Sequence, residues 1–162
     1  MRRAAFPIVF ACSLAFAGPK YEFDGNTLKV PHPVPFEAGK PNLKSESAEA
    51  IAYVKGYLDD KAAISLLRIE VHSDSTDSEK ANQELTEKRA LAVAKALVTK
   101  GVDCKRLIAV GFGSTKPIAD DKTVEGRAQN RRVAFVNAAL RGHAIGGMSP
   151  DGGGKVAGSA CD

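Results

Sequence analysis

A strictly alternating segment followed by a long helical pattern constrains the fold of this chain more than any other feature. In "LLRIEVH", residues 66–72, apolar and polar side chains alternate, which predicts a strand covered on one face. The apolar face holds Leu67, Ile69 and Val71, and the polar face holds Arg68, Glu70 and His72. Residues 79–100 then carry apolar side chains at helical spacing and stop at Gly101, which predicts a helix.

Three segments precede this strand. "YEFDGNTLKV" indicates a small hairpin with its turn at Asp24-Gly25, and the alternating prolines of "PHPVPF" indicate an extended edge strand. A helix is then expected to begin at a capping residue, Ser45. Its apolar stripe consists of Ile51, Val54 and Leu58.

Two more strands follow the long helix. They are predicted in "RLIAVGFG" and "RRVAFVN", and a polar connection with Pro117, which has room for one helical turn, joins them. The order strand, helix, strand, helix, strand, strand predicts an α+β fold. We expect a two-layer sandwich with both helices on one face of a mixed sheet.

The first residues have the features of an export signal. Arg2 and Arg3 precede an apolar stretch, and "AFA" ending at Ala17 matches a signal peptidase site. The stretch is shorter than the roughly 20 residues needed to span a bilayer, so we expect no transmembrane span. Without those two arginines, 21 of the 23 basic residues remain against 19 acidic ones, a balance that does not favour nucleic acid as a partner.

The three cysteines bear on export as well. Cleavage after Ala17 would remove Cys12 and leave Cys104 and Cys161, a pair suited to a disulfide in an oxidising compartment, with two free thiols as the alternative. Cys12 has a second interpretation as the lipidated first residue of a lipoprotein. Phe10 is bulky for such a site, so lipidation is the less favoured alternative.

Composition divides the chain into four parts. We expect a signal peptide at 1–17, an N-terminal extension with the hairpin at 18–33, one folded domain at 34–138 and a Gly-rich tail at 139–162. The tail has seven Gly in the 22 residues from Arg141 onward and few apolar side chains. We therefore expect it to be flexible unless Cys161 is bridged.

Charged residues concentrate where the alternating strand meets the long helix. The loop "SDSTDSEK" is acidic, and Asn82 and Arg89 follow it on the helix. A turn requires Asp or Asn only for its backbone. Taken singly, Asp74 and Asn82 are candidates for turn or cap residues, and Arg89 for a solvated helix face. A turn has no use for a carboxylate and a guanidinium held near each other, so this combination requires another explanation.

Four spaced motifs give this region a family resemblance. They are "HSD", "NQELTEKRA", "GFG" and "GRAQNRRV", in that order. Together they resemble the OmpA-like C-terminal domain, which also occurs in peptidoglycan-associated lipoprotein and in flagellar stator proteins. The resemblance covers about residues 34–138. It implies a periplasmic protein, associated with the cell wall or outer membrane, that binds peptidoglycan through the diaminopimelate of the stem peptide.

The resemblance also implies roles for individual residues. Asp74 would bind the ammonium of diaminopimelate and Arg89 its carboxylate, which a planar guanidinium can hold by two parallel hydrogen bonds. Asn82 would either brace the loop or touch the ligand. Arg131 is a further candidate at the rim, unless it is a charge that protects a strand edge. The family usually has Gly where Val71 stands, which puts the affinity of this loop in doubt.

Other functions were weighed against this one. Ser73, His72 and Asp74 are adjacent, but a catalytic triad requires a geometry that three consecutive residues do not supply. The three histidines lack the spacing of metal ligands, so we expect no catalytic residues, no metal and no cofactor. The remaining alternative is an envelope protein-protein interaction module that uses the same fold without binding the wall.

Overall fold

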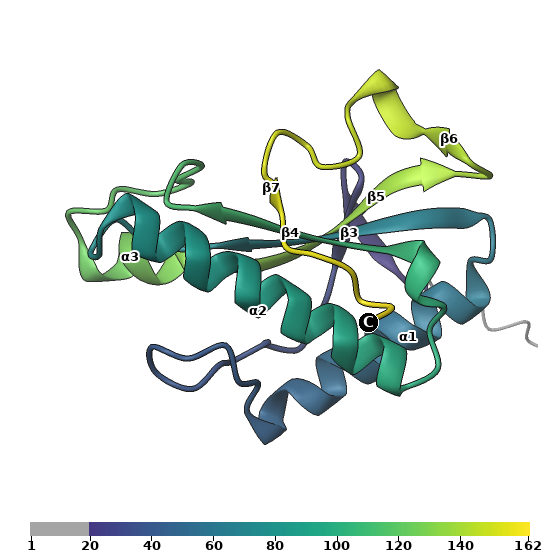
Figure 1. Cartoon of the computed structure of the whole chain (residues 1–162), viewed down its shortest axis with the longest axis horizontal. Coiled ribbons are helices and arrows are strands. Elements are labelled where there is room, and N and C mark those ends of the chain that lie inside the picture. Colours follow the sequence, from purple (N-terminus) through teal and green to yellow (C-terminus); the bar gives the residue numbers. More distant parts are fainter. Residues whose placement is uncertain (1–19) are drawn as a thin grey trace, which may run out of the picture.

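Across residues 20–162, the part of the chain that the computed structural model describes, seven strands form one mixed sheet (Figure 1). Their order is β1-β2-β5-β3-β4-β7, with β6 paired to β5. The bounds are β1 Glu22–Asp24, β2 Thr27–Lys29, β3 Ile64–His72, β4 Leu107–Gly113, β5 Val133–Leu140, β6 His143–Ala144 and β7 Lys155–Val156. Strands β3 and β4 run parallel, and the other pairs are antiparallel. The expected signal peptide and Cys12 lie outside the described residues.

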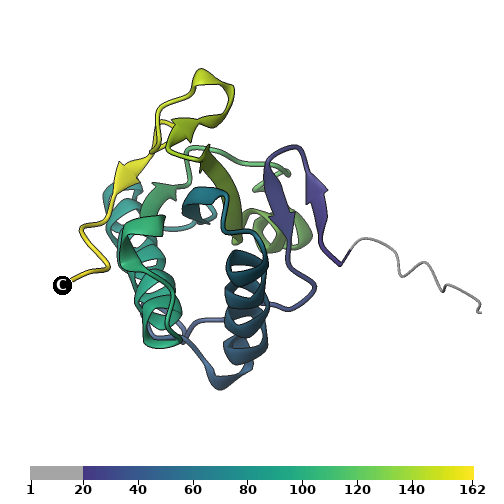
Figure 2. The ribbon, with the colours of Figure 1, turned by 90° about the vertical axis from the view of Figure 1, so that its right-hand side faces the viewer.

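Two long helices, α1 (Ala48–Asp60) and α2 (Glu79–Thr99), pack against one face of this sheet (Figure 2). A shorter helix, α3 (Val124–Asn130), precedes β5, and 3-10 turns occupy Ser45–Ser47, Cys104–Arg106 and Ile145–Gly147. The predicted α+β sandwich is therefore confirmed. The polar connection before β5 holds a helix of seven residues, where one turn was expected.

The core lies between the two long helices and the apolar face of β3. Leu67, Ile69 and Val71 are at least 98% buried, as the alternation predicted. The helices contribute the fully buried side chains Val54, Leu58, Val93, Ala94 and Leu97. Burial of each of the larger apolar side chains contributes about 1.5–3 kcal/mol, so this layer dominates the stability of the fold.

The "GFG" motif allows α2 to lie unusually close to β4. A Cβ atom on Gly111 would stand 2.5 Å from the backbone nitrogen of Glu87, and Gly113 adopts a positive φ of 53°. The Gly113 N–H donates to the Thr86 hydroxyl at 2.9 Å, and Thr86 is fully buried. These contacts fix the register between the helix and the strand end that precedes the polar loops.

Two local predictions were wrong, and the turn of the hairpin was placed one residue too early. "PHPVPF" forms no strand; a single bridge joins Phe36 to Leu43, because proline fixes φ near −65° and favours a solvated extended path over a ladder. Ser45 begins a 3-10 turn and does not cap α1, whose N-cap is Ser47. The hairpin is confirmed, with its turn one residue later than expected, at Gly25-Asn26.

The polar face of β3 is covered, which the alternation did not predict. Arg68 and His72 are 5% and 3% exposed. Arg68 donates to the carbonyl of Pro150 at 3.1 Å, and His72 stacks on Phe112 with ring centroids 4.9 Å apart. The cover over Arg68 comes from the C-terminal segment, which crosses this face (Figure 2).

That Gly-rich segment is tied down along its length. It contains β6, a 3-10 turn and β7, and β7 pairs with β4 at Val110 and Gly111. Cys104 and Cys161 form a disulfide, which confirms the predicted bridge. We expected the tail to be flexible unless Cys161 was bridged. Cys161 is bridged, and the segment is held in place. Strand β5 also runs to Leu140, two residues beyond the boundary drawn at residue 138.

Candidate functional site

The acidic loop between β3 and α2 is held by a buried asparagine. The Asn82 side chain donates to the carbonyls of Asp74 at 2.9 Å and Asp77 at 3.1 Å, and accepts from the Ser73 hydroxyl at 2.9 Å. Asn82 is only 2% exposed. Of the two roles considered for it, this placement favours the brace over the ligand contact. Ser78 caps α2 by accepting from the N–H of Ala81 at 3.2 Å.

The braced loop presents the carboxylate of Asp74, whose side chain is 8% exposed. One oxygen accepts from the Thr76 N–H at 3.0 Å, and the other accepts from Arg131 Nη1 at 2.5 Å. Burial alone would raise the pKa of Asp74. The hydrogen bonds from Arg131 and Thr76 outweigh burial and hold that pKa below its usual value. Asp74 is therefore ionised at neutral pH.

Arg89 lies ten residues into α2 and faces the segment before α1. Its Nε donates to the carbonyl of Lys40 at 3.0 Å, and its Nη2 donates to that of Glu37 at 3.5 Å. The guanidinium also lies 4.9 Å from the ring centre of Phe36, within the range of a cation–π contact. Burial lowers the pKa of Arg89 from its ordinary value, but arginine stays charged in proteins.

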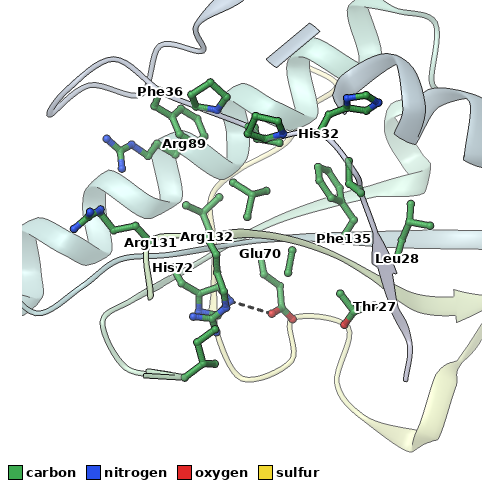
Figure 3. A pocket seen from close by; sticks show the side chains of 18 of the residues that line it. Thr27, Leu28, His32, Phe36, Glu70, His72, Arg89, Arg131, Arg132 and Phe135 are labelled. Carbon is green, nitrogen blue, oxygen red and sulfur yellow. Dashed lines mark hydrogen bonds and ion pairs between the residues drawn. The ribbon is translucent and has the colours of Figure 1, made fainter. Parts of the chain in front are cut away.

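A cleft of about 990 Å³ connects these elements (Figure 3). One wall is the segment from residues 33 to 39, and the other is formed by β2 and the start of β5. Arg89, Arg131 and Arg132 all line it, whereas Asp74 lies behind Arg131 and is not part of its surface. In Figure 3, Arg89 and Arg131 lie toward the same end of the cleft. That end is strongly cationic.

The second polar loop is held by residues that we did not single out from the sequence. Asn130 is fully buried and accepts from the N–H groups of Ile118 and Ala119 at 2.7 and 3.0 Å. Asp121 accepts from the Ser75 N–H at 3.0 Å and so joins this loop to the loop of Asp74. The signal for Asn130 was present, because it is the asparagine of "GRAQNRRV". Nothing in the sequence pointed to Asp121.

The structure thus brings together some of the predicted site residues. Asp74, Asn82 and Arg131 are linked by direct hydrogen bonds. Arg89 makes no hydrogen bond to the other three, and its polar contacts are with the opposite wall. Within residues 20–162, no three His, Cys, Asp or Glu side chains gather as metal ligands, and no helix is both long and apolar enough to cross a bilayer.

Comparison with known proteins identifies the family. Residues 35–131 match the OmpA family, a stretch that contains the first three motifs, the fourth as far as Arg131, and the candidate residues Asp74, Asn82 and Arg89. The chain belongs to the OmpA family. The OmpA family region ends before β5, so the whole C-terminal segment that contains β6 and β7 lies outside it.

Two relatives of this chain are named as a lipoprotein and an outer membrane protein. It is 38% identical to the probable lipoprotein YiaD of Escherichia coli strain K12 over 72% of the chain and 53% of the relative. It is 43% identical to outer membrane protein Omp38 of Acinetobacter baumannii over 60% of the chain and 28% of the relative. The chain therefore spans about half or less of the length of these curated relatives.

Two solved structures with the same fold belong to proteins whose names mention the cell wall or its polymer. The peptidoglycan-associated lipoprotein of Burkholderia pseudomallei is 28% identical, with a TM-score of 0.58 over 65% of this chain and 88% of that one. The cell wall anchor of the T6SS from Pseudomonas aeruginosa is 27% identical, with a TM-score of 0.57 over 64% of this chain and 74% of that one.

Proposed function

We propose that this protein binds peptidoglycan non-covalently in the bacterial envelope, through the free amino acid end of diaminopimelate in the stem peptide. The names of the peptidoglycan-associated lipoprotein and the cell wall anchor, which share the fold, support the polymer as the ligand. The main support for an amino acid head group as the ligand is that a buried carboxylate, that of Asp74, lies beside a cationic cleft that contains Arg89. We place the protein in the periplasm, attached to the wall or the outer membrane.

The chemistry of the head group matches these residues. An amino acid end carries an ammonium and a carboxylate on one carbon, so its receptor needs an acceptor and a donor close together. Asp74 is ionised, and its carboxylate accepts a hydrogen bond from the guanidinium of Arg131. This ion pair supports a role for Asp74 in binding a cationic group of the ligand. The ammonium would take the position of Arg131, which is 49% exposed and free to turn into the cleft.

The carboxylate of the head group would bind the arginines of the cleft. Arg89 can present two parallel N–H groups, a geometry that lysine cannot reproduce. Arg131, once displaced from Asp74, would add a second cation at the rim. The function therefore depends on an exchange in which the ligand's ammonium replaces Arg131 and the ligand's carboxylate meets Arg89.

Sedimentation with purified sacculi tests this function. Leaving one charge without its partner in a partly buried site costs about 2–5 kcal/mol, so Asp74→Asn and Arg89→Ala should each weaken retention at least tenfold. Arg89→Lys should also weaken it. Lys88→Ala, on the exposed neighbour of Arg89, is the matched control and should bind like the wild type. Circular dichroism checks that each variant is folded.

The interaction-module alternative makes the opposite prediction for the same experiment. If Asp74→Asn and Arg89→Ala remain fully bound to sacculi, the cleft is not the receptor. If the wild type is not retained at all, wall binding itself is wrong and the alternative stands.

A further inference from the structure

The cleft borders an open strand edge. Strand β5 pairs with β3 on one side as far as Val133, but on its other side it meets β2 only at Val136 and Phe135. After β2 the chain leaves the sheet, and Pro31, Pro33 and Pro35 lead it to the far wall of the cleft. Within residues 20–162, Val133 and Ala134 therefore have no strand neighbour on the cleft side.

The direction of the backbone groups on β5 follows from two hydrogen bonds. The Asn137 N–H donates toward β2, to the carbonyl of Asn26 at 2.9 Å. The Arg132 carbonyl accepts from β3, from the N–H of His72 at 3.0 Å. Successive residues of a strand direct their N–H and C=O groups to opposite edges, so Val133 shares the direction of Asn137. Its N–H and C=O point to the open edge, and neither has a backbone partner there among the described residues.

We propose that the main chain of the stem peptide lies in this cleft as an added strand, paired with Val133, while its diaminopimelate head group occupies the charged end. This inference rests on the proposed function and extends it from a head group to a peptide. A cleft of about 990 Å³ is at the upper limit for sites that hold drug-sized ligands, and far exceeds what one amino acid end requires. Addition of an extended peptide to an exposed sheet edge is a recurrent mode of peptide recognition.

Charge and spacing support a peptide as the occupant. Val133 follows Arg131 by two residues, about 7 Å along a strand, so a short extended peptide can reach from one to the other. The three arginines of the cleft complement a ligand that carries several carboxylates. Beside the open edge the lining is apolar, with Val30, Val34 and Phe135, which suits small aliphatic side chains more than sugar hydroxyls.

A comparison of two ligands on one variant tests the inference. Val133→Pro removes the N–H at the first residue of a strand, where proline is tolerated, and Val133→Thr keeps both the N–H and the branched shape. By calorimetry, Val133→Pro should bind a soluble tetrapeptide muropeptide about three- to tenfold more weakly than the wild type, the effect of one hydrogen bond. Its affinity for free diaminopimelate should not change. Val133→Thr should match the wild type with both ligands.

The outcomes separate this inference from the function on which it rests. Equal muropeptide affinity of the wild type and Val133→Pro overturns the added strand and leaves the head-group site intact. Absence of binding to both ligands by the wild type overturns the proposed function and the inference with it.

Amide exchange in the wild type gives a second test that needs no substitution. In a muropeptide-saturated sample the Val133 amide should exchange at least tenfold more slowly than in the free protein, since its N–H would be hydrogen-bonded. Free diaminopimelate should leave this rate unchanged. The Ala134 amide, which faces β3, is the internal control. An unprotected Val133 amide in the saturated complex would contradict the pairing.

Discussion

Arg131 and Asp74, 57 residues apart in sequence, meet in an ion pair at 2.5 Å in the ligand-free protein. The pair joins the end of α3 to the loop after β3. It also places a positive charge where the proposed ligand brings its own. In the ligand-free protein, Arg131 therefore already occupies the position that we propose for the ammonium of the ligand.

Removal of Arg131 should change the titration of Asp74. In Arg131→Gln the pKa of the Asp74 carboxyl should rise, because burial is then opposed by fewer hydrogen bonds. A carboxyl whose pKa is lower in the folded state stabilises the fold at pH values above its unfolded pKa of about 3.9. This stabilisation is lost as the pH falls through the folded pKa. Since Arg131 is half-exposed, the loss of stability at pH 7 should be at most about 1 kcal/mol.

Carbon-13 NMR of the Asp74 carboxyl, with urea unfolding at pH 7 and pH 2, measures both effects. The difference in stability between the two proteins should shrink as the pH falls through the folded pKa of Asp74. An unchanged pKa in Arg131→Gln would show that the pair does not form in solution.

Two glycine substitutions should have opposite effects on stability. Gly111→Ala should destabilise by about 1–3 kcal/mol or more, since the new Cβ would stand 2.5 Å from the backbone nitrogen of Glu87. Gly56→Ala should stabilise by about 0.5–1 kcal/mol, because Gly56 lies inside α1 and its Cβ would be 3.7 Å from the Tyr21 hydroxyl. Urea unfolding curves compare them directly. A tolerated Gly111→Ala would mean that α2 can move away from β4.

Loss of the disulfide should release the C-terminal cover. In the chain-entropy model, opening a loop with a separation of 57 residues costs about 4 kcal/mol, so Cys161→Ser should lower the unfolding free energy by up to that amount. The amides of β7 should also exchange faster. A dithiol reductant should act on the wild type in the same way and leave Cys161→Ser unchanged. If reduction changes neither stability nor exchange, the cover is held by its other contacts alone.

Acid should weaken the fold through His72. Burial lowers the pKa of His72, although its hydrogen bond to Glu70 opposes this effect. The unfolded chain then takes up a proton first, so the stability contributed by neutral His72 is complete above about pH 6.5 and is lost as the pH falls through the folded pKa. The unfolding free energy of the wild type should fall between pH 7 and pH 5.

The matched variants are His72→Asn and His143→Asn. His72→Asn should flatten this dependence, because the titrating group is gone. His143 is exposed, so His143→Asn should keep the pH dependence of the wild type. An equal slope for His72→Asn and the wild type would assign the effect to other groups.

Local pattern was enough to predict the central part of the fold. Strand β3 and helix α2 have strong periodicity, and the motifs around them drew attention to Asp74 and Asn82, which the structure joins by a hydrogen bond. Arg89, predicted with them, bonds instead to the opposite wall of the cleft. Periodicity reports which face of a strand is apolar, but not what covers the polar face. The burial of Arg68 depends on a segment about 80 residues later, which a disulfide and β7 hold in place, and His72 stacks on Phe112 of the neighbouring strand.

The hydrogen-bond partners of the site residues could not be predicted from the sequence either. Arg89 bonds to the carbonyls of Lys40 and Glu37, and a backbone carbonyl carries no sequence signal. The pairing of Asp74 with Arg131 depends on how β5 and β3 align, which only the assembled sheet determines. The open edge of β5 follows from the failure of "PHPVPF" to form the expected strand.

The hydrogen bonds from Arg89 to the 37–40 turn affect the thermodynamics of ligand binding. Its guanidinium fastens the 37–40 turn through two carbonyls, so an anion that recruits those N–H groups must first loosen that turn. The enthalpy gained from the incoming carboxylate is then offset by the bonds given up, while the liberated turn gains entropy. Binding of a carboxylate at Arg89 would therefore replace hydrogen bonds within the protein by hydrogen bonds to the ligand.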